Sequence, residues 1–150
     1  MAEIYIEGNI GVGKSTFLKL LEEELNYPVI YEPVDEWVKT CDSDGKNILD
    51  KFYQNSERWS FAFQMNSFIS RIRKIEESKY SVRFIERSVF TDRKCFAENC
   101  YTDGKMTKLE YDIYKNWHDW LCKKFNIVPR HFIYLKTSPN ICFERIKKRS

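Results

Sequence analysis

The chain has 150 residues, near the commonest size of a single domain, so we expect one domain over residues 1–150. Hydrophobic residues make up 43% of it and aromatic residues 16%, which excludes disorder over most of the chain. The charge balance is 25 − 22 = +3, too small an excess to indicate a nucleic-acid-coating or membrane-surface protein. No apolar run approaches the ~18 residues of a membrane span. We therefore expect a soluble protein with neither nucleic acid nor membrane as a partner.

The cysteines and the N-terminus predict a cytoplasmic protein. Five cysteines occur without any C-x-x-C pair, which argues against a disulfide framework and against a zinc site. The first residues have neither the basic region and apolar stretch of a signal peptide nor the Arg-rich character of a transit sequence. Reduced thiols are the state we expect.

Strand and helix signals alternate through the first half of the chain. Residues 3–7 alternate as a strand, a glycine-rich segment follows, and residues 15–25 have apolar side chains at helical spacing. A second short strand, residues 29–31, is stopped by Glu32-Pro33, because proline has no N–H to donate. Residues 40–47 are expected to form an exposed loop.

A long helical pattern then runs from about residue 47 to residue 79. A break is expected near Asn55-Ser56, where Ser56 is the candidate cap of a new helix. The apolar stripe of this segment predicts a core face and consists of Phe61, Met65, Phe68, Ile72 and Ile75. A separate polar face carries Ser60, Gln64, Ser67 and Arg71.

The second half continues the alternation. Residues 82–85 form a predicted strand that ends at Glu86-Arg87-Ser88, and residues 92–99 have a helical pattern. Thr107 and Glu110 have capping-box spacing before a helix to about residue 125. A fourth strand is expected at 131–135, and Ser138-Pro139 opens a last helix. The pattern predicts an α/β fold with a parallel sheet covered by helices on both faces.

The glycine-rich segment carries the clearest chemical signal. It satisfies G-x-x-x-x-G-K-[ST], the phosphate-binding loop, between a predicted strand and a predicted helix, with the residues Gly8, Asn9, Ile10, Gly11, Val12, Gly13, Lys14 and Ser15. Its glycines let consecutive N–H groups turn toward a phosphate, and the helix presents its positive dipole end to the same anion. We expect Lys14 to neutralise the β- and γ-phosphates of a nucleoside triphosphate and the Ser15 hydroxyl to bind Mg²⁺.

Two carboxylates and an arginine follow neighbouring strands. Glu32 comes just after the second strand and Glu86-Arg87 at the end of the third, so both should share one edge of the sheet with the loop. A carboxylate can take the proton of an acceptor hydroxyl, and an arginine can stabilise a migrating phosphoryl group. Helix capping or a surface position is the alternative for either glutamate.

These residues belong to a collinear set of segments that resembles the deoxynucleoside kinases, most closely the deoxycytidine and deoxyguanosine kinase branch. The set runs through nearly the whole chain and comprises residues 8–17, 32–34 with Trp37, 57–64, 70–73, 86–93 and 117–120. The resemblance implies the P-loop kinase fold and transfer of the γ-phosphoryl of ATP, or another triphosphate, to the 5′-hydroxyl of a deoxynucleoside. It also implies a homodimer packed through long helices.

The resemblance implies a role for each matching residue. Glu32 matches the family's carboxylate beside the 5′-hydroxyl, in the role of general base, and Glu86 matches the carboxylate near magnesium, although some descriptions of the family exchange these two roles. Arg87 matches the arginine that steadies the 5′ end. The residues matching nucleoside contacts are Trp37, Phe63 and Phe96 around the base, Gln64 on the base edge and Tyr53 near the 3′-hydroxyl. Without the family, core packing is the preferred reading of these aromatic residues. Thr16 continues the loop match, and Arg145 and Arg149 match the first arginines of a phosphate-covering lid.

Arg71 and Asp92 bear on which base is accepted. In the resembling branch this pair lies beside the base, whereas thymidine-accepting relatives have uncharged residues there. An aspartate can accept from an exocyclic amine such as cytosine N4, while thymine offers a carbonyl and a methyl group. We therefore expect deoxycytidine and purine deoxynucleosides to be favoured over thymidine by about tenfold to a hundredfold. An ordinary surface ion pair is the alternative for Arg71.

The match stops inside the lid, because the remaining lid, its sugar-binding acidic residue, the adenine-contacting loop and a fifth strand have no counterpart in the sequence. We therefore expect a C-terminally incomplete kinase domain. Two other functions remain open at this stage: a nucleoside monophosphate kinase such as thymidylate kinase, and a non-catalytic nucleotide-binding remnant.

Overall fold

The computed structural model describes residues 2–128 and 130–148. The chain divides into two compact units. The sheet unit comprises Met1–Glu32, Ser78–Ser88 and Pro129–Ser150, and the helical unit comprises Pro33–Glu77 and Val89–Val128. In the part of the chain that the structure describes, none of the helices is both long and apolar enough to cross a lipid bilayer.

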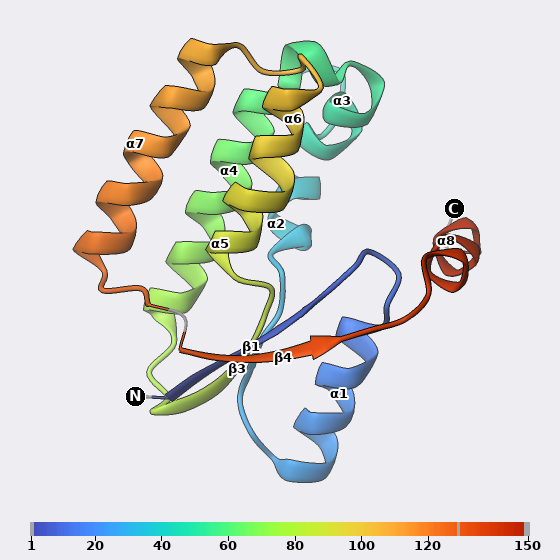
Figure 1. The fold of residues 1–150 in the computed structure, drawn as a ribbon, viewed down its shortest axis with the longest axis vertical. Coiled ribbons are helices and arrows are strands. Elements are labelled where there is room, and N and C mark those ends of the chain that lie inside the picture. Colours follow the sequence, from blue (N-terminus) through green and yellow to red (C-terminus); the bar gives the residue numbers. More distant parts are fainter. Residues whose placement is uncertain (1, 129, 149–150) are drawn as a thin grey trace. The chain divides into compact units, whose positions relative to one another are not determined.

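The sheet unit is built on four parallel strands (Figure 1). They lie in the order β2-β3-β1-β4, with the bounds β1 Ala2–Gly8, β2 Val29–Ile30, β3 Val82–Glu86 and β4 His131–Leu135. Two helices belong to the same unit, α1 (Lys14–Leu25) and α8 (Pro139–Lys147). Leu18 of α1 packs with Ile6 and Phe84 in a buried core. The parallel α/β architecture expected from the alternation is confirmed.

The register of the strands brings their carboxyl ends to one edge. Ile6 of β1 pairs with Glu86 of β3, and Gly8 pairs with Leu135 of β4. Ile30 of β2 pairs with Ile85. The segments that follow β1, β2 and β3 therefore leave the sheet side by side, as expected for a parallel sheet.

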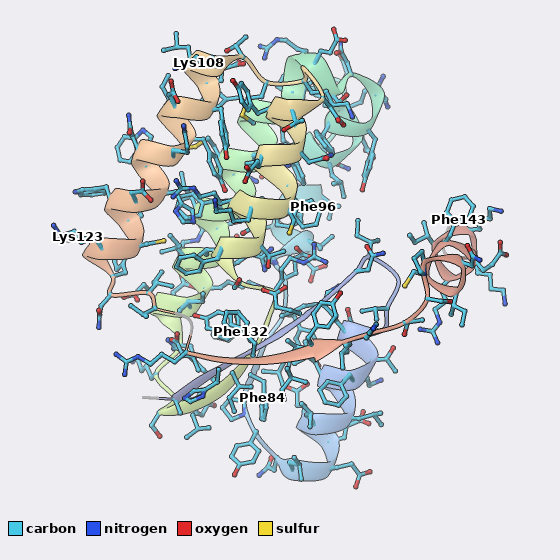
Figure 2. The ribbon with its side chains drawn as sticks, viewed as in Figure 1. Phe84, Phe96, Lys108, Lys123, Phe132 and Phe143 are labelled. Carbon is cyan, nitrogen blue, oxygen red and sulfur yellow. The ribbon has the colours of Figure 1, made fainter. Side chains whose placement is uncertain are left out.

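The side chains of β4, an edge strand of the sheet, are less enclosed than those of β3. Phe84 of β3 is buried, whereas Phe132 of β4 is half-exposed and touches the ring of Tyr5 at a centroid distance of 5.9 Å (Figure 2). Phe143 of α8 is largely exposed and points outward from its helix (Figure 2). β4 is the more accessible of the two edge strands, because residues 131–134 are exposed whereas Val29 and Ile30 of β2 are half-buried.

The helical unit is a set of helices around its own core. Its elements are α2 (Val34–Lys39), α3 (Ile48–Gln54), α4 (Ser56–Glu77), α5 (Val89–Thr91), the π-helix η1 (Asp92–Ala97), α6 (Glu98–Thr102) and α7 (Lys108–Lys124). In Figure 1, α4 and α7 run beside the continuous α5–η1–α6 segment. Phe68 and Ile72 of α4, Ala97 of η1 and Tyr114 of α7 share one buried cluster. The predicted apolar stripe of α4 is confirmed as a core face.

Three local expectations differ from the structure. The break at residue 55 is confirmed, but the cap of α4 is the side chain of Asn55, which accepts the Arg58 N–H at 3.1 Å, and not that of Ser56. Helix α2 was not expected, because only six residues separate Pro33 from the exposed loop. The predicted helix over 92–99 is instead a π-helix followed by α6. The capping box of α7 is confirmed.

Candidate active site

The phosphate-binding loop joins β1 to α1, and its backbone excludes side chains at two glycines. Gly8 has φ +147°, and a Cβ built on it would lie 2.6 Å from the Leu135 carbonyl oxygen of β4. Gly11 has φ +79°, and its Cβ would lie 2.5 Å from the Cys142 carbonyl oxygen of α8. Any larger residue would both strain the backbone and displace a neighbouring main chain. The loop is therefore held against β4 and α8.

Lys14 is the buried cation of this loop. Its side chain is 6% exposed, and its Nζ donates to the Gly8 carbonyl at 3.1 Å and to the Asn9 carbonyl at 2.9 Å. The pKa of Lys14 is lowered to about 8, chiefly by burial and then by the nearby Arg87 guanidinium, while Glu86, Glu32 and Glu7 act in the opposite direction. Glu32, Glu86 and Arg87, which the sequence predicts to take part in phosphoryl transfer, thus all influence the pKa of Lys14.

Glu86 joins the loop to the ends of β2 and β3. The Ser15 hydroxyl donates to Glu86 Oε1 at 2.7 Å, and the Glu32 backbone N–H donates to Glu86 Oε2 at 3.3 Å. The Glu86 carboxylate is buried, whereas Ser15 is at the surface. The predicted convergence of Ser15, Glu32 and Glu86 at one edge of the sheet is confirmed.

The two oxygen groups of Ser15 and Glu86 fit what Mg²⁺ requires. Mg²⁺ prefers oxygen ligands and keeps several waters, so one carboxylate and one hydroxyl beside the phosphates of a nucleotide are a sufficient protein contribution. Among the described residues, His, Cys, Asp and Glu side chains do not gather in threes at metal-binding distance. Ser15 and Glu86 are the residues that would hold the ion.

The segment after β3 turns sharply at Arg87. Arg87 has φ +64°, in the left-handed region that non-glycine residues rarely adopt, and its side chain is buried. Its backbone N–H donates to the Ile6 carbonyl at 3.0 Å, and the next N–H, that of Ser88, donates to Glu7 Oε1 at 2.8 Å. Glu7 was missed by the sequence reasoning. The available signal was an acidic residue in a predicted strand directly before the first glycine of the loop.

One of the two predicted lid arginines reaches the phosphate-binding loop. The Arg145 guanidinium of α8 donates to the carbonyls of Val12 at 2.9 Å and Gly11 at 3.5 Å. Arg149 lies outside the described residues. Thr16 and Ile10 are exposed at the surface of the loop and of α1. A guanidinium from a segment far along the sequence therefore lies against the loop.

In the helical unit, the predicted aromatic residues are brought together only in part. The rings of Trp37 and Phe63 pack edge to face at 5.4 Å, and the Trp37 indole N–H donates to the Ser70 hydroxyl at 2.9 Å. Phe52, which was not singled out from the sequence, stacks on Phe63 at 4.7 Å. Tyr53 is 75% exposed, and its ring packs against that of Phe52 at a centroid distance of 5.4 Å. Phe96 is half-buried on η1.

Arg71 and Asp92 form a buried, two-point ion pair. Arg71 Nε lies 2.7 Å from Asp92 Oδ2 and Arg71 Nη2 lies 3.2 Å from Asp92 Oδ1. The two side chains are 1% and 3% exposed, so the alternative of a surface ion pair is wrong. Gln64 is buried on the same face of α4, and its amide donates to the Cys100 thiol at 3.8 Å. Charged and amide groups are thus enclosed in the interior of the helical unit.

The fold of the sheet unit and the geometry around Lys14 define a phosphate-binding-loop α/β protein. The family model described as deoxynucleoside kinase matches residues 4–150, and the chain therefore belongs to the deoxynucleoside kinase family. It is 37% identical to deoxycytidine kinase 2 of Gallus gallus over 99% of its length and 37% identical to deoxycytidine kinase of Mus musculus over 98%. It is also 36% identical, over 99% of its length, to a probable deoxycytidine kinase of Fowlpox virus.

The relatives are longer than this chain. The matched region covers 65% of the Gallus gallus and Mus musculus proteins and 61% of the viral one. The resemblance inferred from the collinear segments is thus confirmed for the family, while the roles of individual site residues remain predictions.

The lowered pKa of Lys14 predicts that nucleotide affinity depends on pH. Below about pH 8 the amine is charged and can bind a triphosphate, whereas above its pKa of about 8 the charge is lost. Because one proton is linked to binding, ATP affinity should weaken as the pH rises from 7 to 9, approaching about tenfold per pH unit above 8. Calorimetric titration of the protein with ATP at several pH values measures this. A constant affinity over that range would contradict it.

Breaking the buried ion pair of the helical unit should be costly. Asp92→Asn leaves the Arg71 guanidinium buried without its counter-charge, and we expect it to lower the free energy of unfolding by about 3–5 kcal/mol. The double variant Arg71→Met with Asp92→Leu removes both charges and should recover most of that loss. Urea denaturation measures all three proteins.

The matched control for this prediction is Lys108→Met, which breaks the exposed Lys108–Asp112 pair of α7 (Figure 2). It should leave the denaturation midpoint unchanged, because exposed ion pairs contribute little. An Asp92→Asn midpoint equal to that of Lys108→Met would show that the buried pair carries no special energy.

Proposed function

We propose that this protein is a deoxynucleoside kinase that transfers the γ-phosphoryl group of ATP to the 5′-hydroxyl of a deoxynucleoside. The observation that carries the proposal is the cluster at the end of β1, where Lys14, Ser15, Glu86, Glu32 and Arg87 surround one phosphate-binding loop. Family membership supports the same reaction class. The chain spans about 65% of the length of the first relatives named above, so its own activity requires a direct test.

In the proposed reaction each side chain has one task. Lys14 and the loop N–H groups hold the β- and γ-phosphates, and Arg145, beside the loop, adds positive charge. Ser15 and Glu86 would hold a Mg²⁺ ion, which would supply positive charge opposite the charge that develops on the phosphate oxygens. Glu32 accepts the proton of the 5′-hydroxyl as its oxygen bonds to the γ-phosphorus and the bond to the β-phosphate oxygen breaks. Arg87 stabilises the migrating group.

We propose that the helical unit recognises the base and favours deoxycytidine and purine deoxynucleosides over thymidine. The support is the buried Arg71–Asp92 pair together with Gln64 on the same helix face. Asp92 can accept from an exocyclic amine, and Gln64 can donate to and accept from a base edge. Trp37, Phe63 and Phe96 would supply apolar walls, and Tyr53, exposed as it is, would contact the sugar.

Replacement of the proposed base should remove catalysis but not binding. Glu32→Gln keeps the size of the side chain and loses the proton acceptor, so we expect turnover to fall by about a hundredfold or more while nucleoside affinity stays within a few-fold. Glu23→Gln, an exposed position on α1, is the control and should behave like the unchanged protein. A coupled assay of ADP release measures turnover. Full activity of Glu32→Gln with loss of activity in Glu86→Gln would assign the base to Glu86.

The same assay, run with the four deoxynucleosides and with thymidine monophosphate, tests the reaction class. Phosphorylation of deoxycytidine and purine deoxynucleosides ahead of thymidine is the expected result. Phosphorylation of the monophosphate alone would indicate a nucleoside monophosphate kinase. Binding of ATP and nucleoside without any turnover would indicate a nucleotide-binding protein that lacks catalysis.

We further propose that the protein forms a homodimer through the outer face of α7. Four large apolar side chains are exposed along this helix: Leu109, Ile113, Trp117 and Trp120. Ile113, Trp117 and Trp120 line a surface pocket together with Asn116. Contiguous apolar patches of this kind usually mark an interaction surface.

Localisation in the cytoplasm remains a prediction from the sequence, consistent with free thiols at all five cysteines.

A charge placed in this patch should separate the dimer. Trp117→Glu introduces a carboxylate into the centre of the apolar face, and we expect it to convert a dimer into a monomer in sedimentation or light-scattering measurements. Tyr80→Glu, at another exposed aromatic position, should stay dimeric. A monomeric unchanged protein would exclude this interface.

A further inference from the structure

Three consecutive residues at the end of β1 each hold a different part of the site. The Ile6 carbonyl accepts the Arg87 N–H at 3.0 Å, the Glu7 carboxylate accepts the Ser88 N–H at 2.8 Å, and the Gly8 carbonyl accepts Lys14 Nζ at 3.1 Å. In this series only Glu7 contributes a side chain. Its bond joins residues 81 apart in sequence and is buried.

The bond from Glu7 lies at the point where the backbone is least favourable. Arg87 has a left-handed φ of +64° although it carries a long side chain, and such a conformation persists only where the surroundings hold it. The two backbone N–H groups that flank the Arg87 α-carbon, those of Arg87 and Ser88, both donate hydrogen bonds to β1. Two hydrogen bonds therefore hold this turn to β1, and the Glu7 carboxylate provides the one that comes from a side chain.

Glu3, on the same strand, provides an internal comparison. Residues 3 and 7 point to the same face of β1, and both carboxylates bind groups of the β3 segment. Glu3 pairs with the buried Arg83 guanidinium at the start of β3, far along the strand from the phosphate-binding loop. Glu7 instead binds main chain beside Arg87 and lies near Lys14. The two glutamates share a chemical group and a strand but hold different ends of β3.

We propose that Glu7 is a positioning residue of the active site. Its carboxylate holds the Glu86-Arg87-Ser88 turn in the conformation that keeps the Arg87 side chain and the Glu86 carboxylate at the phosphate-binding loop. Glu7 neither binds substrate nor takes part in proton transfer in this role. The inference rests on the proposed function for its catalytic consequence, but the Glu7–Ser88 bond itself can be measured without turnover.

The experiment compares two substitutions of equal length. Glu7→Gln keeps a side-chain oxygen that can accept the Ser88 N–H, and Glu7→Met fills the same space without a comparable acceptor. The control pair Glu3→Gln and Glu3→Met makes the same changes at the other end of β3. For each protein, hydrogen exchange of the Ser88 amide, ATP affinity, and kcat and KM for deoxycytidine are measured.

For Glu7→Met we expect Ser88 exchange to accelerate by about tenfold or more and kcat to fall by about tenfold or more, with KM for deoxycytidine within about threefold. Glu7→Gln should keep most of the Ser88 protection and most of kcat. Both Glu3 variants should leave Ser88 exchange and kcat unchanged, even where their melting temperature falls. Unaltered Ser88 exchange and kcat in Glu7→Met would overturn the proposal, as would equal losses in Glu7→Gln and Glu7→Met.

Two safeguards keep the outcome decisive. If Glu7→Met does not fold, Glu7→Asp replaces it, because its carboxylate is one methylene too short to keep the 2.8 Å bond. If the unchanged protein shows no phosphoryl transfer, the proposed function fails, while Ser88 exchange and ATP affinity still decide the role of Glu7. Loss of Ser88 protection with unchanged ATP affinity in that case would reduce Glu7 to a purely structural residue and overturn the proposal.

Discussion

Burial of one ammonium group, that of Lys14, constrains the rest of the sheet unit. A charge removed from water requires compensating partners, and Lys14 has two loop carbonyls at hydrogen-bond distance and three carboxylates nearby. Those carboxylates come from the ends of three different strands. Only parallel strands in matching register bring such ends to one edge, so the order β2-β3-β1-β4 and the chemistry of the loop depend on one another.

The helical unit keeps charge in its interior for a different purpose. A buried ion pair contributes little to stability compared with apolar packing, because desolvation offsets most of the attraction. The Arg71–Asp92 pair is nevertheless fully enclosed among core residues of α4 and η1. Such a pair is more readily understood as a device for specificity than for stability. The proposed preference among bases would follow from which ligand can share its hydrogen bonds.

The sequence allowed the sheet, the loop and the acidic strand ends to be predicted, because each depends on local pattern: hydrophobic periodicity, glycine spacing and the proline after β2. What escaped prediction depends on distant contacts. The role of Glu7 comes from a bond across 81 residues, and the position of Phe52 against Phe63 comes from the packing of α3 on α4. The Asn55 cap was missed because Asn55 and Ser56 are both good capping residues, and only the backbone decides between them.

The π-helix η1 accommodates an additional residue within an otherwise α-helical segment. A π-turn holds an extra residue relative to an α-helix, and η1 separates Asp92, in the buried ion pair, from Phe96 and the core residue Ala97. Deleting one residue there would allow an uninterrupted α-helix to form from α5 into α6. Side chains beyond the deletion would keep their directions about the helix axis, because the π-turn absorbs the extra residue locally, whereas side chains inside the turn would shift relative to Asp92. A length change in this segment would therefore alter side chains within one helical turn and leave those of α6 in place, so that an insertion or deletion can change the residues beside the ion pair without disturbing the rest of the helix.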